Sequence, residues 1–142
     1  MSASGYRASL KIGPHEAGIR DDVLYTRFDG DFSYEHAKDL MTFVGDQFGT
    51  SPYYAVCDIR RQGATSADAR RLLVEWTRSR QLRAAAMIGG NAVARAMTRL
   101  VSSAIRVFNK QAILVYFVDS EAAAEAWIAQ QKQSDQGQAR NA

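Results

Sequence analysis

The sequence predicts a single α/β domain in which a mixed, mainly parallel β-sheet carries helices packed on it. Short apolar segments alternate along the chain with segments whose apolar residues recur at helical spacing. Two of the short segments, 84–88 and 112–118, lack polar alternation, which is typical of strands covered on both faces. Residues 6–12 do alternate, so they add an edge or antiparallel strand. The predicted order is β-β-α-β-α-β-α-β-α.

The N-terminal part is expected to form two antiparallel strands. The first covers residues 6–12, where every second residue is apolar. Residues 14–22 are polar and contain Gly18, so they are expected to be a connection without regular structure. The second strand covers residues 23–28 and ends at the turn signal of residues 29–31, Asp-Gly-Asp.

The first helix is predicted to begin after Ser33, whose hydroxyl can accept from the unpaired amides of the first turn. Gly49 ends it at a position that tolerates a positive φ. One apolar stripe faces the sheet: Ala37, Leu40, Met41, Val44 and Phe48.

A buried strand over residues 54–59 carries Asp58 near its carboxyl end, and a polar loop over residues 60–65 follows it. Ser66 then opens a helix that reaches about Arg80, with apolar residues at helical spacing: Ala69, Leu72, Leu73 and Trp76. In open α/β sheets, ligands and partners bind past the carboxyl ends of the parallel strands. Asp58, the loop and Ser66 are therefore expected at the functional edge.

The C-terminal half is expected to contain two more helices. Asn91 follows the turn Gly89-Gly90 and caps a helix reaching about Phe108. The strand 112–118 is the most apolar in the chain, so it is expected at or near the centre of the sheet. A last helix begins after Asp119 or Ser120. The domain is expected to span residues 1–131, and the glutamine-rich residues 132–142 to form a disordered tail.

Composition indicates a soluble cytoplasmic protein. The 142 residues are 46% hydrophobic and 23% charged, without an apolar run that could span a membrane or a secretory signal. The net charge of +3 comes without a Lys/Arg-rich run, so no nucleic-acid partner is expected. Cys57 is the only cysteine, and neither histidine has metal-ligand spacing, so no disulfide, metal or cofactor is expected.

Several residues are candidates for binding. Asp58 either pairs with Arg60 or Arg61 or contacts a partner; it has no identifiable nucleophile beside it, so no enzymatic activity is expected. The helix over residues 91–108 has more apolar positions than one packing face needs, which favours self-association or a partner as an alternative to plain burial. Arginines that either form a plain solvated face or flank an acidic partner or lipid headgroups are Arg95, Arg99 and Arg106, extended by Arg70 and Arg71. Arg60 and Arg61 are further candidates for partner binding.

Four segments together resemble the STAS domain, and more closely the stand-alone SpoIIAA-like proteins grouped as STAS/Sec14-like. They are residues 24–32 before the Ser33-capped helix, the strand 54–58 ending in Asp, the Ile-Gly-Gly-Asn turn at 88–91 and the closing segment 117–128. The last, with Phe117, a run of acidic and alanine residues, and Trp127, is the most distinctive.

The resemblance implies a non-enzymatic regulatory or protein-interaction module, in the manner of partner-switch signalling, with a protein partner and a homodimer. In anti-sigma-factor antagonists of this family, a partner kinase phosphorylates a serine at the start of the helix after the Asp-ended strand. Ser66, with Thr65 beside it, is the nearest match. The chain departs from that pattern because no glycine follows, and Asp68 already places negative charge in the first turn.

The Sec14-like association implies an alternative, a carrier or sensor of a small apolar or anionic ligand. Candidate residues for lining its cleft are Trp76, Met97 and Phe108, with Phe43 beside them. All of them are also ordinary core residues.

Overall fold

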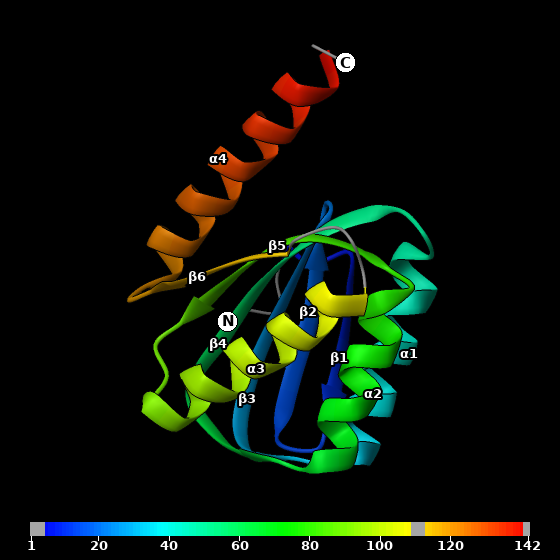
Figure 1. The fold of residues 1–142 in the computed structure, drawn as a ribbon, viewed down its shortest axis with the longest axis vertical. Coiled ribbons are helices and arrows are strands. Elements are labelled where there is room, and N and C mark those ends of the chain that lie inside the picture. The colour runs from blue at the N-terminus through cyan, green and yellow to red at the C-terminus, as the bar shows by residue number, and fades with distance from the viewer. Residues whose placement is uncertain (1–4, 109–112, 141–142) are drawn as a thin grey trace.

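Six strands form one mixed sheet in the computed structural model of this chain, which describes residues 5–108 and 113–140 (Figure 1). The strands lie in chain order: β1 (Ala8–Ile12), β2 (His15–Arg20), β3 (Val23–Phe32), β4 (Pro52–Thr65), β5 (Gln81–Ile88) and β6 (Leu114–Val118). β1, β2 and β3 pair antiparallel, whereas β3 to β6 pair parallel. The predicted single α/β domain with a mixed, mainly parallel sheet is confirmed.

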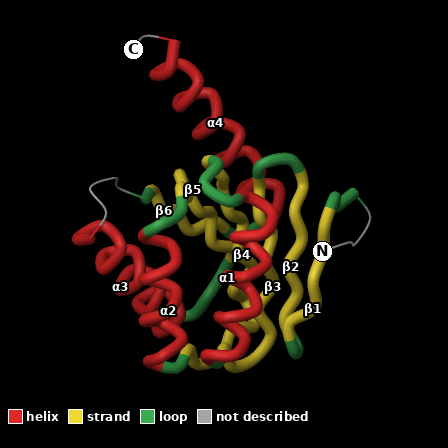
Figure 2. Tube along the Cα trace, turned by 90° about the vertical axis from the view of Figure 1, so that its right-hand side faces the viewer, coloured by secondary structure: helices red, strands yellow, loops and turns green. Residues whose placement is uncertain are grey.

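Four helices cover the sheet: α1 (Tyr34–Phe48), α2 (Ala67–Arg78), α3 (Ala92–Phe108) and α4 (Glu121–Arg140). Figure 2 shows α1, α2 and α3 side by side along one face of the sheet. The larger apolar cluster lies beneath them, and it contains Leu40 of α1, Ala69 of α2 and Ala94 of α3. α4 packs through Ala124 and Ile128 in a second cluster, and its far end rises beyond the sheet (Figure 1).

The predicted helix caps are present. Ser33 Oγ accepts from the His36 backbone amide at 3.2 Å, and His36 Nδ1 accepts from the Ser33 amide at 3.1 Å, which together make a capping box. Gly49 ends α1 with a φ of 58°. The five residues of the predicted apolar stripe are the buried residues of α1.

The N-terminal region contains one strand more than predicted, so the element order β-β-α-β-α-β-α-β-α was wrong at its start. Residues 14–22 were expected to be irregular, but β2 lies there and separates β1 from β3. The buried side of β2 begins with His15, and this polar residue hides the strand in the sequence. His15 is buried because its ring is hydrogen-bonded on both nitrogens, to the Asp29 amide and the Asp31 carbonyl.

β3 and β4 are longer than predicted. The turn signal at residues 29–31 lies inside β3, and residues 60–65, predicted as a loop, continue β4. Polar groups of the two strands form hydrogen bonds with each other. Arg61 Nε lies 3.3 Å from Asp29 Oδ1, and Asp31 Oδ1 accepts from the Ala64 amide at 2.9 Å. Shifts in the parallel register around Asp29 and Gly30 accommodate this polar stretch.

Two expectations for the C-terminal part were wrong. β6 is an edge strand, because β5 is its only neighbour within the described sheet; residue 112 lies outside the described residues. Tyr116 of β6 gains cover by stacking on Trp127, with ring centroids 5.4 Å apart. Residues 132–140, expected to be disordered, continue α4, because Lys132 pairs with Asp22 and the Tyr54 hydroxyl donates to Asp135.

Candidate functional site

Asp58 lies in the middle of β4, opposite Ile88 at the carboxyl end of β5, and it pairs with Arg60. Its side chain is 7% exposed and accepts from Arg60 Nη2 at 2.7 Å, Arg60 Nε at 3.0 Å and the Arg60 amide at 3.1 Å. The guanidinium hydrogen bonds lower the pKa of Asp58, although burial opposes that change. Asp58 is therefore a fixed carboxylate that orients Arg60.

Arg60 and Arg95 flank the turn Gly89-Gly90 from two sides, and Arg99 lies one helical turn farther along α3. A Cβ added at Gly89 would lie 2.3 Å from Arg60 Cγ, so the Arg60 stem lies directly on this turn. From the other side, Arg95 Nε donates to the Gly89 carbonyl at 3.3 Å. The guanidinium carbons of Arg95 and Arg99 lie 5.0 and 4.9 Å from the ring centre of Phe117. We call Arg60, Arg95 and Arg99 the arginine cluster.

The start of α2 lies at the end of β4. Ser66 is the N-cap of α2, since its Oγ accepts from the Ala69 amide at 3.3 Å and donates to Asp68 Oδ1 at 2.5 Å. This hydrogen bond from Ser66 lowers the pKa of Asp68. Arg70 Nη1 donates to the Thr65 carbonyl at 2.6 Å. Ser66 is exposed at the surface, and the Asp68 carboxylate and the Arg70 guanidinium lie close to it.

The predicted binding residues separate into two groups. Asp58 pairs with Arg60 of the arginine cluster, whereas Arg61, Arg70 and Arg71 border β3, β4 and the start of α2. The side chain of Arg106 lies outside the described side chains. Helical spacing predicted that Arg95 and Arg99 share one side of α3, but only the fold brings Phe117 beneath them and Arg60 to the other side of the Gly89-Gly90 turn.

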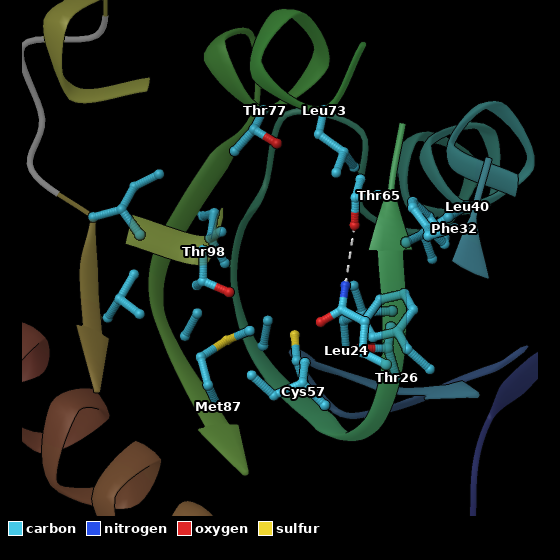
Figure 3. Close-up of a pocket in the computed structure, with 18 of the residues that line it drawn as sticks. Leu24, Thr26, Phe32, Leu40, Cys57, Thr65, Leu73, Thr77, Met87 and Thr98 are labelled. Atoms are coloured by element: carbon cyan, nitrogen blue, oxygen red, sulfur yellow. Dashed lines mark hydrogen bonds between the residues drawn. The ribbon is translucent and has the colours of Figure 1, made fainter. Parts of the chain in front are cut away.

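A cavity of about 170 Å³ lies between the sheet and helices α1, α2 and α3 (Figure 3). Its described wall is mainly apolar and includes Leu24, Leu40, Leu73 and Met87. Trp76, a predicted cleft residue, is not in this wall. Its ring packs under the Arg80 guanidinium, whose central carbon lies 5.4 Å from the centre of the Trp76 ring. The side chains of Met97 and Phe108 lie outside the described side chains.

Sequence reasoning missed the polar residues of the cavity wall, which include Thr26, Cys57, Gln62 and Thr98. Burial raises the pKa of the Cys57 thiol to about 11. Alternation along β3 and β4 could have assigned Thr26 and Cys57 to the helix-covered face. It fails for Gln62, because the register shift between β3 and β4 adds a residue to β4 before Gln62.

The described residues carry neither a group of three or more possible ligands that could hold a metal ion nor a helix long and apolar enough to cross a membrane. No curated protein matches the sequence. Residues 17–132 match a family described as a domain of unknown function (DUF7793).

Solved structures show the same fold at low sequence identity. An uncharacterised protein of the DUF3478 family from Shewanella loihica PV-4, with a SpoIIAA-like fold, has a TM-score of 0.59 and 15% identity; 80% of this chain and 92% of that chain are covered. The anti-sigma factor antagonist SpoIIAA in its unphosphorylated form has a TM-score of 0.56 and 7% identity; 82% of this chain and 97% of that chain are covered. A sulfate transporter family protein from Wolinella succinogenes has a TM-score of 0.51 and 18% identity; 81% of this chain and 91% of that chain are covered. The STAS/SpoIIAA-like fold is thereby confirmed.

Proposed function

The chain belongs to the family described as a domain of unknown function (DUF7793), and we propose that it is a non-enzymatic, STAS-type regulatory module that binds a protein partner. The observation that carries the proposal is the arginine cluster, which lies by the carboxyl end of β5 and the start of α3. In open α/β sheets, ligands bind outside the carboxyl ends of the parallel strands, and we extend this to a protein partner. The SpoIIAA likeness supports a regulatory role by analogy of fold.

The charge of the surface favours an acidic partner. The Arg60 side chain is 51% exposed although Asp58 neutralises it, and Arg99 is exposed with only an aromatic ring described beneath it. The amino-terminal end of α3 adds the positive end of a helix dipole. Arg61, 75% exposed, and Arg71 extend the positive surface toward the start of α2.

Ser66, with Thr65 as the alternative acceptor, is the proposed site of regulation. A phosphate on Ser66 would remove the hydrogen bond that Ser66 donates to Asp68 and place two negative charges beside that carboxylate. The same dianion would compete with an acidic partner for Arg71. Modification is therefore expected to release the partner.

The partner-binding proposal is tested by comparing variants as bait in a quantitative pull-down from the native host. Wild type and Lys38→Glu are expected to retain the same protein, since Lys38 is exposed on α1, away from the cluster. Arg99→Glu changes the charge by the same amount within the cluster and is expected to reduce retention at least tenfold. Equal retention by Arg99→Glu and Lys38→Glu would contradict the proposal.

A homodimer belongs to the same proposal. Leu114 and Tyr116, each 52% exposed, lie on the edge strand β6, and Leu100 of α3 is 55% exposed. An edge strand has unpaired backbone groups that can pair with a second copy. Light scattering after size-exclusion chromatography is expected to give twice the mass of one chain, and Tyr116→Lys is expected to restore the monomer mass.

A second candidate function, the carrier or sensor of a small ligand, is favoured by one specific observation. This is the cavity beneath α2, whose wall contains buried polar atoms without partners.

A further inference from the structure

We propose that the cavity between the sheet and helices α1, α2 and α3 binds a small apolar molecule that carries a hydroxyl group, in the size range of a phenol or a short-chain alcohol. This site is separate from the arginine cluster, and the proposal holds whether or not the module binds a protein partner.

The size and lining of the cavity fit such a molecule. A volume of about 170 Å³ is slightly larger than an engineered apolar cavity of about 150 Å³ in another protein that takes up benzene. Figure 3 shows Leu24, Leu40, Leu73 and Met87 arranged around the open space. These side chains come from the sheet and from two helices, so they surround an occupant from several sides.

Two buried polar atoms in the wall indicate that the occupant is not a pure hydrocarbon. Thr26 is 2% exposed, and its Oγ1 has no hydrogen-bond partner among the described residues other than the Cys57 thiol. Cys57, opposite Thr26 in the register of β3 and β4, offers only a weakly hydrogen-bonding thiol. The second unpaired atom is Gln62 Oε1, since the amide nitrogen of Gln62 already donates to Thr65 Oγ1 at 3.3 Å (Figure 3).

A hydroxyl group can pair with either atom because it donates and accepts. Gln62 Oε1 accepts only, whereas the Thr26 hydroxyl does either. If the amide of Gln62 were reversed, its nitrogen would need an acceptor, and a hydroxyl would still serve. A carboxylate cannot donate to Gln62 Oε1. The cation in the wall, Arg70, already donates to the Thr65 carbonyl at 2.6 Å, which favours a neutral ligand over an anion.

The test is a calorimetric titration of the full chain with phenol, toluene and benzoate. Phenol and toluene have nearly the same shape, so they differ mainly in the hydroxyl group. We expect phenol to bind with one-to-one stoichiometry and at least fivefold more tightly than either of the other two. Absence of phenol binding, equal affinity for toluene, or tighter binding of benzoate would each overturn the proposal.

Two pairs of variants locate the site. Thr98 of α3 lies in the wall, so Thr98→Leu is expected to fill the cavity and abolish phenol binding. Ser103→Leu adds the same side chain at an exposed position of α3 and is expected to leave binding unchanged. Thr26→Val and Gln62→Met keep the shape of the wall and are expected to reduce the preference for phenol over toluene to less than twofold. Phenol binding unaffected by Thr98→Leu would show that it binds elsewhere.

A measurement on the unmodified chain guards against variants that fail to fold. Cys57 is the only cysteine and lies in the cavity wall, so its alkylation by iodoacetamide at pH 9 reports on access to the cavity. Saturating phenol is expected to slow this reaction at least threefold, whereas benzoate at the same concentration leaves it unchanged. An unchanged rate in saturating phenol would overturn the proposal.

Discussion

His15 shows how a single polar residue can belong to the core of this protein. It is 1% exposed, with Nδ1 accepting from the Asp29 amide at 3.0 Å and Nε2 facing the Asp31 carbonyl at 2.8 Å. A neutral ring that carries its proton on Nε2 satisfies both contacts, whereas a protonated ring would lose the hydrogen bond from Asp29. The neutral form is therefore the form that the fold requires.

The pH dependence of stability follows from His15. Burial lowers its pKa below the ordinary value of about 6.5, so the unfolded chain binds a proton first as the pH falls. The free energy of unfolding is expected to be constant above about pH 6.5 and to decrease below it, until the pH reaches the folded-state pKa. Urea denaturation at pH 8 and pH 5.5 measures the change, and His15→Gln is expected to reduce it. Equal pH dependence in both proteins would exclude His15 as the cause.

Ser66 combines a structural role with a proposed regulatory one, and two substitutions separate them. Ser66→Ala removes the cap and is expected to cost about 1 kcal/mol of stability while partner retention stays unchanged. Ser66→Asp preserves a capping oxygen, so its stability is expected within about 0.5 kcal/mol of wild type, but its added charge should weaken retention in the pull-down. If partner retention in the pull-down decreased in proportion to the loss of stability in both variants, Ser66 would have only the structural role.

At the scale of elements, the turn between β5 and α3 depends on glycine. Gly89 has a φ of 74°, and the Arg60 side chain occupies the space of its missing Cβ. Gly89→Ala is expected to destabilise the chain by about 1–3 kcal/mol and to displace Arg60. Gly137→Ala in α4 meets no atom within 4 Å and is expected to be neutral or stabilising by up to about 1 kcal/mol. Thermal denaturation of both variants checks the difference, and equal effects would contradict the role of the turn.

The last turns of α4 are anchored by contacts to the sheet side of the domain. Lys132 pairs with Asp22, and Asp135 accepts from the Tyr54 hydroxyl, which contributes to the raised pKa of Tyr54 together with burial. Asp135→Ala is expected to cost about 1 kcal/mol in urea denaturation, whereas Gln133→Ala at an exposed position should cost nearly nothing. If both changes were neutral, residues 132–140 would not be held by these contacts.

At the scale of the whole molecule, the sequence predicts the elements whose signals are local. The start of α1 was predicted because Ser33 and the apolar stripe are contained in one segment, and the same holds for Ser66 and α2. β2 was missed because the partners of His15 are 14 and 16 residues away. The edge position of β6 was missed because hydrophobicity does not identify the neighbours of a strand.

The candidate sites follow the same rule. Asp58, Ser66 and the α3 arginines could be selected from the sequence, since each lies at a recognisable joint. The cavity could not, because its wall is assembled from β3, β4, β5, β6 and three helices. The contact of Arg60 with Gly89 likewise depends on the parallel pairing of β4 with β5.

The central claim is that the carboxyl edge of the sheet, around the arginine cluster, is a partner-binding surface. Site-specific photocrosslinking in the native host tests it most directly, with a photoreactive amino acid placed at position 99, in the cluster, or at position 38, on α1. We expect one discrete crosslinked protein from position 99, absent from position 38 and lost when Arg60→Glu is added. No crosslink from position 99, or the same crosslinks from both positions, would contradict it.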